Sequence, residues 1–195
     1  PFDGYDPIAI SSGGTLWDNA AALGKTIRVF GEYAGIAQRD PNIKDERLRT
    51  LEAWRRGESF LTRYHTVAPI RRLNDFLAAN YPAYGGIVPD VVRADIFLDH
   101  LKQWQRAGKM PQLVIAQLPS DHTSGTSEGW TTPAAALADN DWALGKMVEG
   151  LSKSPFWPTM AIFVVEDDAQ GGVDHVDGHR TVALAVSPYT RRGSI

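Results

Sequence analysis

A group of acidic and imidazole side chains follows two apolar runs of the sequence, and their types suit the binding of a divalent cation. They are Asp121, His122, Asp167, Asp168, His175 and His179. Carboxylate oxygens with imidazole nitrogens bind zinc, manganese or iron, whereas carboxylates alone favour magnesium or calcium. A bound cation polarises a phosphoryl oxygen and lowers the pKa of a hydroxyl or water nucleophile. The pattern therefore makes a metal-dependent hydrolase the leading interpretation.

The elements that position these side chains are predicted to be strands and helices of an α/β fold. The apolar runs at 112–118 and 159–165 are typical of buried strands, and a helix predicted over 132–151 joins them. In such a strand-helix-strand unit both strands are parallel, so their carboxyl ends face the same way. Ligand sites of open α/β sheets lie at that edge. We therefore expect Asp121 and Asp167 to lie close together.

A further strand is predicted at 181–186. The connection before it, 168–180, is too short and too rich in glycine for a crossover helix, so this strand should run antiparallel to 159–165. Its first residue then lies at the same edge of the sheet. This topology brings His175 and His179 beside the acidic pair.

The remaining pattern predicts a single domain over 1–195. Further predicted elements are helices at 15–23, 70–80 and 91–106 and a strand at 26–30. The segment 38–66 is dense in charge and is predicted to be a surface insertion with one helix and a solvated charged face. Asp141 shares a face of the 132–151 helix with Leu137 and Leu144, and we expect it to be a buried structural side chain. His65 and His100 are interpreted as non-catalytic.

Composition narrows the classes of partner and site. The net charge is -3 and no basic run is present, which argues against a nucleic-acid backbone as the partner and fits a small-molecule or exposed ester substrate. The sequence contains no cysteine, which excludes disulfides, thiolate zinc sites and cysteine nucleophiles, and fits an extracytoplasmic bacterial protein, periplasmic or secreted. No apolar stretch approaches the roughly 18 residues of a membrane span.

Several strings, in order along the chain, carry a resemblance to a known family. They are Leu-Pro-Ser-Asp-His-Thr at 118–123, Thr-Pro at 132–133, Ala-Asp-Asn-Asp at 138–141, Phe-Val-Val-Glu-Asp-Asp at 163–168, Gly-Val-Asp-His-Val-Asp-Gly-His-Arg-Thr at 172–181 and Ser-Pro-Tyr at 187–189. The chain resembles the bacterial phosphoesterases of the alkaline-phosphatase-like superfamily, which include acid phosphatases and phosphatidylcholine-type phospholipases C. The matches are densest from Met110 to Gly193.

The resemblance implies a three-layer α/β/α sandwich with a mostly parallel sheet, and metal-assisted hydrolysis of a small-molecule or lipid phosphoric ester. Asp167 and Asp168 match the metal-binding acidic pair of the relatives, although Asp168 replaces a glutamate there. Asp121 and His122 match the string that completes the metal site. The cation expected from this set is zinc, manganese, magnesium or calcium.

The histidines between the acidic pair and the last strand are the candidates for catalytic contact. His175 and His179 are expected to be ligands or phosphate contacts, and His175 is alternatively a general acid for the leaving group. Arg180 is a candidate for neutralising phosphate charge.

One departure from the family pattern concerns the nucleophile. The family carries its first metal-binding segment and its nucleophile ahead of the string that matches Leu-Trp-Asp at 16–18, and nothing in this sequence matches them. The chain is therefore expected to correspond to the C-terminal portion of such a domain, with weak or no activity alone. The alternatives are a sulfatase or phosphonate hydrolase of the same superfamily, and a non-catalytic binding protein on the same fold.

Overall fold

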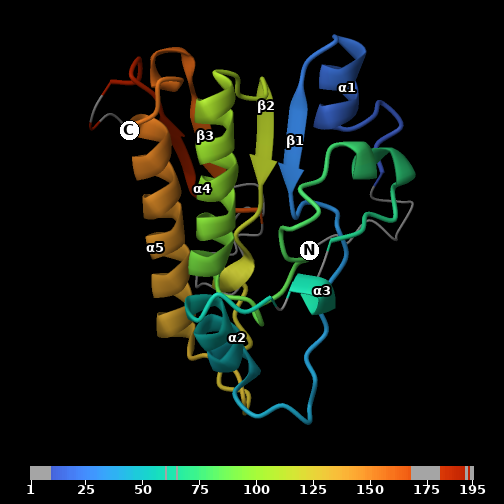
Figure 1. The fold of residues 1–195 in the computed structure, drawn as a ribbon, viewed down its shortest axis with the longest axis vertical. Helices are drawn as coiled ribbons and strands as arrows, with labels where there is room; N and C mark the ends of the chain where they lie inside the picture. Colours follow the sequence, from blue (N-terminus) through green and yellow to red (C-terminus); the bar gives the residue numbers. More distant parts are fainter. Residues whose placement is uncertain (1–9, 60, 65, 168–180, 192, 194–195) are drawn as a thin grey trace. The chain divides into compact units, whose positions relative to one another are not determined.

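A computed structural model of the chain describes residues 10–59, 61–64, 66–167, 181–191 and 193 (Figure 1). The described residues form both helices and strands and include a small parallel sheet, which confirms the predicted α/β class. The chain divides into two compact units, 1–147 and 148–195, and the division falls within helix α5, Pro133–Ser152. Across the described residues, no helix combines the length and the apolar character that spanning a membrane requires.

The sheet of the first unit consists of β1 and β2, as the apolar runs predict. β1 (Ile27–Phe30) and β2 (Leu113–Ala116) pair in parallel, with Ile27 opposite Leu113 and Phe30 opposite Ala116 (Figure 1). The carboxyl ends of the two strands therefore lie at one edge. Figure 1 places helix α2 (Glu46–Arg55) on the side toward which both strand arrows point.

Alternate side chains of β1 pack on opposite faces, and both faces are covered. Val29, fully buried, belongs to a cluster with Trp17 of α1 (Leu16–Ala22) and Leu73. On the other face the ring of Phe30 lies 5.1 Å from that of Phe97 in α4 (Asp90–Ala107). Burial of these large side chains on both sides is what fixes the strand in place.

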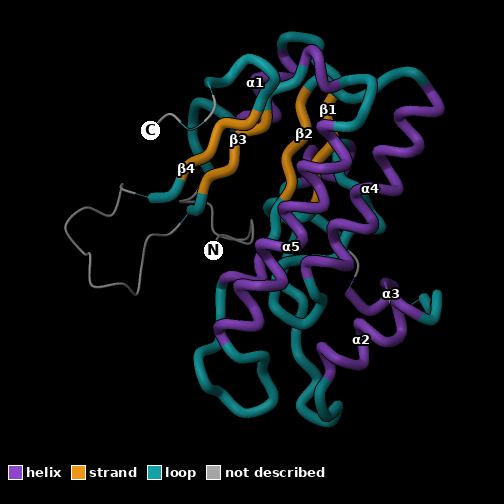
Figure 2. The backbone as a smooth tube through the Cα atoms, turned by 90° about the vertical axis from the view of Figure 1, so that its left-hand side faces the viewer, coloured by secondary structure: helices purple, strands orange, loops and turns teal. Residues whose placement is uncertain are grey.

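Local sequence signals define the ends of the helices. Thr15 caps α1 in a capping box with Asp18, in which each side chain bonds the other's backbone N–H. α4 ends at Gly108, whose φ of 65° is the left-handed value that glycine adopts at low cost. Figure 2 shows α4 and α5 side by side, and the ion pair between Lys146 and Asp95 joins them.

The helix predicted over 70–80 does not form. Only a short 3-10 helix is present, at Arg71–Asp75. The residues after it pair with β1 instead, because Val29 donates to the Phe76 carbonyl at 2.9 Å and accepts from the Ala78 N–H at 2.8 Å. The pairing places Leu77 in the core, which a continuing helix would prevent.

The charged segment contains the predicted helix, α2, and a second short helix, α3 (Leu61–Tyr64). The predicted solvated face is wrong for two of its charges. Glu46 is 3% exposed and bonds the Tyr64 hydroxyl, and the Arg47 side chain is 13% exposed. The charges of α2 thus divide between solvent and the interior.

The second unit contains an antiparallel pair of strands, as predicted. β3 (Ile162–Val165) pairs with β4 (Ala183–Val186), with Ile162 opposite Val186. The two apolar side chains Phe163 and Val165, on one face of β3, are 76% and 65% exposed. The predicted parallel relation between β2 and β3 connects the two units and stays a prediction.

Candidate functional site

Asp121 and His122 lie at the carboxyl end of β2, as the sequence predicts. A short 3-10 helix, Pro119–Asp121, follows the strand, and His122 comes directly after it. Asp121 is half-buried, and its Oδ1 accepts a hydrogen bond from the His122 N–H at 3.1 Å. The exposed His122 ring stands edge-on to Tyr84, with 5.8 Å between centroids. Both side chains therefore sit at the edge where parallel strands end.

The other predicted ligands are only partly described. Asp167 is exposed and lies just beyond β3, where the neighbouring Glu166 N–H bonds the Val182 carbonyl at 3.1 Å. Asp168, His175 and His179 lie outside the described residues. The same holds for Arg180, the candidate phosphate contact, and for His65, which we expect to be non-catalytic. The proximity of Asp121 to Asp167 concerns two separate units and stays a prediction.

The donor chemistry of Asp121 and His122 fits a divalent cation. A carboxylate oxygen and an imidazole nitrogen from adjacent residues suit zinc or manganese. Within the ranges that the structure describes, however, no group of three or more histidine, aspartate or glutamate side chains is close enough to hold a metal ion. A metal ion held by Asp121 and His122 would therefore need further ligands from outside the described residues around Asp121.

A buried polar network fixes the turn that carries Asp121. At its centre is Asp90, the first residue of α4, which is fully buried. One carboxylate oxygen accepts from the Ser120 N–H at 2.8 Å and from the Asn140 side chain at 3.1 Å, and the other accepts from Arg93 at 3.2 Å. Burial raises the pKa of Asp90, and the Arg93 guanidinium opposes that rise. Because all these partners donate, the arrangement uses the ionised carboxylate.

Arg93 is buried as completely as its partner. Its side chain is 1% exposed and, besides Asp90, it donates to the backbone carbonyls of Val88, Ala83 and Gly85. A guanidinium needs this many acceptors to be buried without a large desolvation cost. The pair ties the segment before α4 to the start of that helix.

Asp139, on α5, forms a second centre next to Asp90. Its Oδ2 accepts from the Asp90 N–H at 2.6 Å and from the Ser120 hydroxyl at 2.9 Å, and its Oδ1 accepts from the Val91 N–H at 3.2 Å. A carboxylate at these N–H groups satisfies the first turn of α4 and complements its dipole. Asp139 thus does for α4 what an N-cap side chain usually does, since Pro89 at the cap makes no side-chain hydrogen bond.

The backbone between β2 and Asp121 is held at successive residues. The Tyr81 hydroxyl donates to the Gln117 carbonyl at 2.7 Å, and Asn140 donates to the Leu118 carbonyl at 2.8 Å. Ser120 is bonded through both its N–H and its hydroxyl, as described above. Side chains from α4, α5 and the Tyr81 region therefore fix the chain up to the residue before Asp121.

The sequence pattern did not predict this network, because the large apolar residues of α5 do not mark its buried face. Leu137 is 52% exposed and Asp141 is exposed too, so the expectation of a buried Asp141 is wrong. The buried stripe instead runs through Ala136, Ala143 and Met147, at helical spacing. Small residues on this face let α5 approach closely enough for Asp139 and Asn140 to reach α4 and β2. That alanine stripe was the available signal.

His100, which we expect to be non-catalytic, contacts Asn80 and the aromatic ring of Phe30 in β1. Its Nε2 lies 2.8 Å from the Asn80 Oδ1, and its ring stands edge-on to Phe30 with 5.1 Å between centroids. Burial, with a contribution from Arg28, lowers the pKa of His100.

Comparison of the chain with protein-family models, with curated proteins and with solved structures found no match.

Proposed function

We propose that the chain is part of a metal-dependent phosphoesterase, with Asp121, His122, Asp167 and Asp168 as cation ligands. The observation that supports the proposal is the placement of Asp121 and His122 at the carboxyl end of β2, after a backbone that buried hydrogen bonds hold in place. A fixed backbone beside a carboxylate and an imidazole favours metal binding, because hydrogen bonds that orient the ligands strengthen a metal site.

The proposed substrate is a small-molecule or lipid phosphoric ester. When bound, a divalent cation would supply Lewis-acid polarisation of the phosphoryl oxygen and a lowered pKa for the nucleophile. His122 and Asp121 would hold it from the β2 side, and the predicted roles of His175 and His179 in contacting phosphate or the leaving group belong to the same proposal. The proposed architecture is the three-layer sandwich with a mostly parallel sheet, of which β1 and β2 are the parallel pair.

Cation binding is the first test, because it does not depend on a nucleophile. We expect Mn²⁺ or Zn²⁺ to bind the purified protein and to bind at least about tenfold more weakly after Asp121→Ala or Asp167→Ala. The control is Asp99→Ala, an exposed carboxylate on α4 paired with Lys102. A protein that takes up neither ion, or one whose affinity is the same in all three variants, would rule out the proposed site.

Substrate class is tested with matched chromogenic esters. We expect any metal-dependent turnover to be seen with p-nitrophenyl phosphate or p-nitrophenylphosphorylcholine and not with p-nitrophenyl sulfate. Preference for the sulfate ester would instead favour the sulfatase alternative. Tight cation binding with no turnover of any ester would favour a binding protein, or a domain whose nucleophile is supplied by another segment.

A further inference from the structure

Among the described residues of the charged segment 38–66, Arg47 contacts the turn before Asp121. From α2, Arg47 donates through Nη2 to the Ser120 Oγ at 2.9 Å and to the Asp139 Oδ2 at 2.7 Å, and through Nη1 to the Gly86 carbonyl. The side chains of Arg47 and Asp139 are 13% and 16% exposed. The fork geometry of the guanidinium is what allows one side chain to make these three bonds.

We infer that Arg47 is a positioning residue for the cation site, acting through Ser120 on the adjacent Asp121 and His122. This inference rests on the proposed function and adds the charged segment to the site that it describes. Ser120 Oγ lies between Arg47 and Asp139, accepting from the first and donating to the second at 2.9 Å. These two hydrogen bonds fix the orientation of the Ser120 hydroxyl and link the turn before Asp121 to both α2 and α5.

The chemistry of the contact explains why an arginine stands here. Asp139 Oδ2 already accepts from the Asp90 N–H and the Ser120 hydroxyl, and its negative charge is half-buried beside the Asp90 carboxylate. Arg47 places a positive charge against the pair, while its second nitrogen anchors on Gly86 in the segment before α4. A lysine in this place would keep the charge but lose the second anchor.

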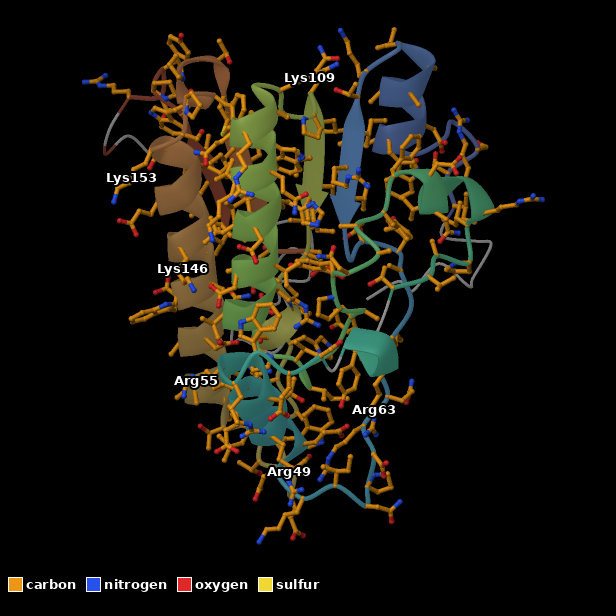
Figure 3. The ribbon with its side chains drawn as sticks, in the orientation of Figure 1. Arg49, Arg55, Arg63, Lys109, Lys146 and Lys153 are labelled. Carbon is orange, nitrogen blue, oxygen red and sulfur yellow. The ribbon has the colours of Figure 1, made fainter. Side chains whose placement is uncertain are left out.

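A neighbouring arginine of α2 provides a matched control. Arg49, two residues along, is exposed and extends from α2 away from the strands (Figure 3). Arg49→Met removes the same charge from the same helix without touching the turn. Arg47→Met removes the charge and both anchors at nearly constant volume, and Arg47→Lys restores only the charge.

The test measures the position of His122 before it measures the metal. In the metal-free protein, the His122 ring resonance, assigned with His122→Gln, should shift in Arg47→Met and stay unchanged in Arg49→Met. In a Co²⁺ titration followed by visible absorption, Arg47→Met should bind about tenfold more weakly, which is typical of removing a group that orients ligands. Arg47→Lys should unfold in urea at nearly the wild-type midpoint yet keep the weakened affinity and a shifted His122 resonance.

The outcomes separate this inference from the proposed function. If wild type takes up no Co²⁺, the proposed metal site fails, and the metal-free His122 resonance alone decides the role of Arg47. An unchanged resonance and affinity in Arg47→Met would overturn the positioning role even though the protein binds cobalt. If Arg47→Met does not fold, the same two measurements on the folded Arg47→Lys variant decide, and wild-type values in both would overturn the inference.

Discussion

β2 and β3 are both short apolar strands followed by an acidic string, yet their surroundings differ. Around β2, the partner strand is buried on both faces, and the turn after the strand is bonded by Asp90, Asp139 and Asn140. Around β3, Phe163 and Val165 are largely exposed, and Asp167 is exposed as well. In the described residues, buried hydrogen bonds therefore hold the string after β2, whereas the end of β3 is exposed. A motif alone does not indicate how rigidly its side chains are held.

Two phenylalanines, Phe30 in β1 and Phe163 in β3, give the strongest contrast. Phe30→Ala removes a fully buried ring and should lower the free energy of unfolding by about 3–5 kcal/mol. Phe163→Ala removes a ring that is 76% exposed and should cost less than about 0.5 kcal/mol. Urea denaturation followed by circular dichroism measures both. A cost at Phe163 equal to that at Phe30 would mean that β3 is packed as tightly as β1, and the contrast would disappear.

The buried ion pair at the start of α4 should rank next. Asp90→Asn leaves the Arg93 guanidinium buried without a counter-charge, and we expect a loss of about 3 kcal/mol in the same denaturation experiment. Asp99→Asn, in a pair with Lys102 that is 55% exposed at the carboxylate, should change stability by less than about 0.5 kcal/mol. Equal effects would show that the network is not the main support of the β2 turn.

Two glycines in the loop after His122 allow a second comparison between matched substitutions. Gly129 has a φ of 78°, and a Cβ there would clash with the guanidinium of Arg39, which lies over Trp130. Gly125 also has a positive φ, 60°, but an added Cβ would meet nothing within 4 Å. Both alanine substitutions should cost about 1 kcal/mol for the backbone conformation. Only Gly129→Ala should also displace Arg39, which Trp130 fluorescence reports, provided that other tryptophans are replaced by phenylalanine.

The smallest expected effect is a pH dependence that belongs to the first unit. The pKa of His100 is lowered in the folded protein, so below the ordinary value of about 6.5 the unfolded chain binds more protons. Stability should therefore fall as the pH drops below that value, and level off below the folded-state pKa. His100→Gln should flatten this part of the stability profile. An identical profile in the variant would contradict the assignment to His100.

Local pattern predicted much of this fold, and its failures have a physical cause. The strands β1 and β2 and the helices α4 and α5 follow from apolar runs, periodicity and capping residues near them in sequence. Residues 76–78 were missed because Val29, far away in sequence, takes their backbone hydrogen bonds. Arg47 and Asp139 were missed as partners because 92 positions separate them. A charged residue is predicted to be solvated unless its counter-charge is known, and a short stretch of sequence does not contain a partner that lies far along the chain.

The first turn of α4 has its amides bonded by a carboxylate that lies 49 residues later in the chain. A helix that begins at Pro89–Asp90 without a local cap is incomplete when it emerges during synthesis, and only the docking of α5 completes it. We therefore expect the end of β2 and the start of α4 to form their native hydrogen bonds together, once α5 has docked. Amide protons of Asp90 and Val91 should accordingly exchange with solvent at the rate at which α5 detaches, and not at the rate at which a helix end frays.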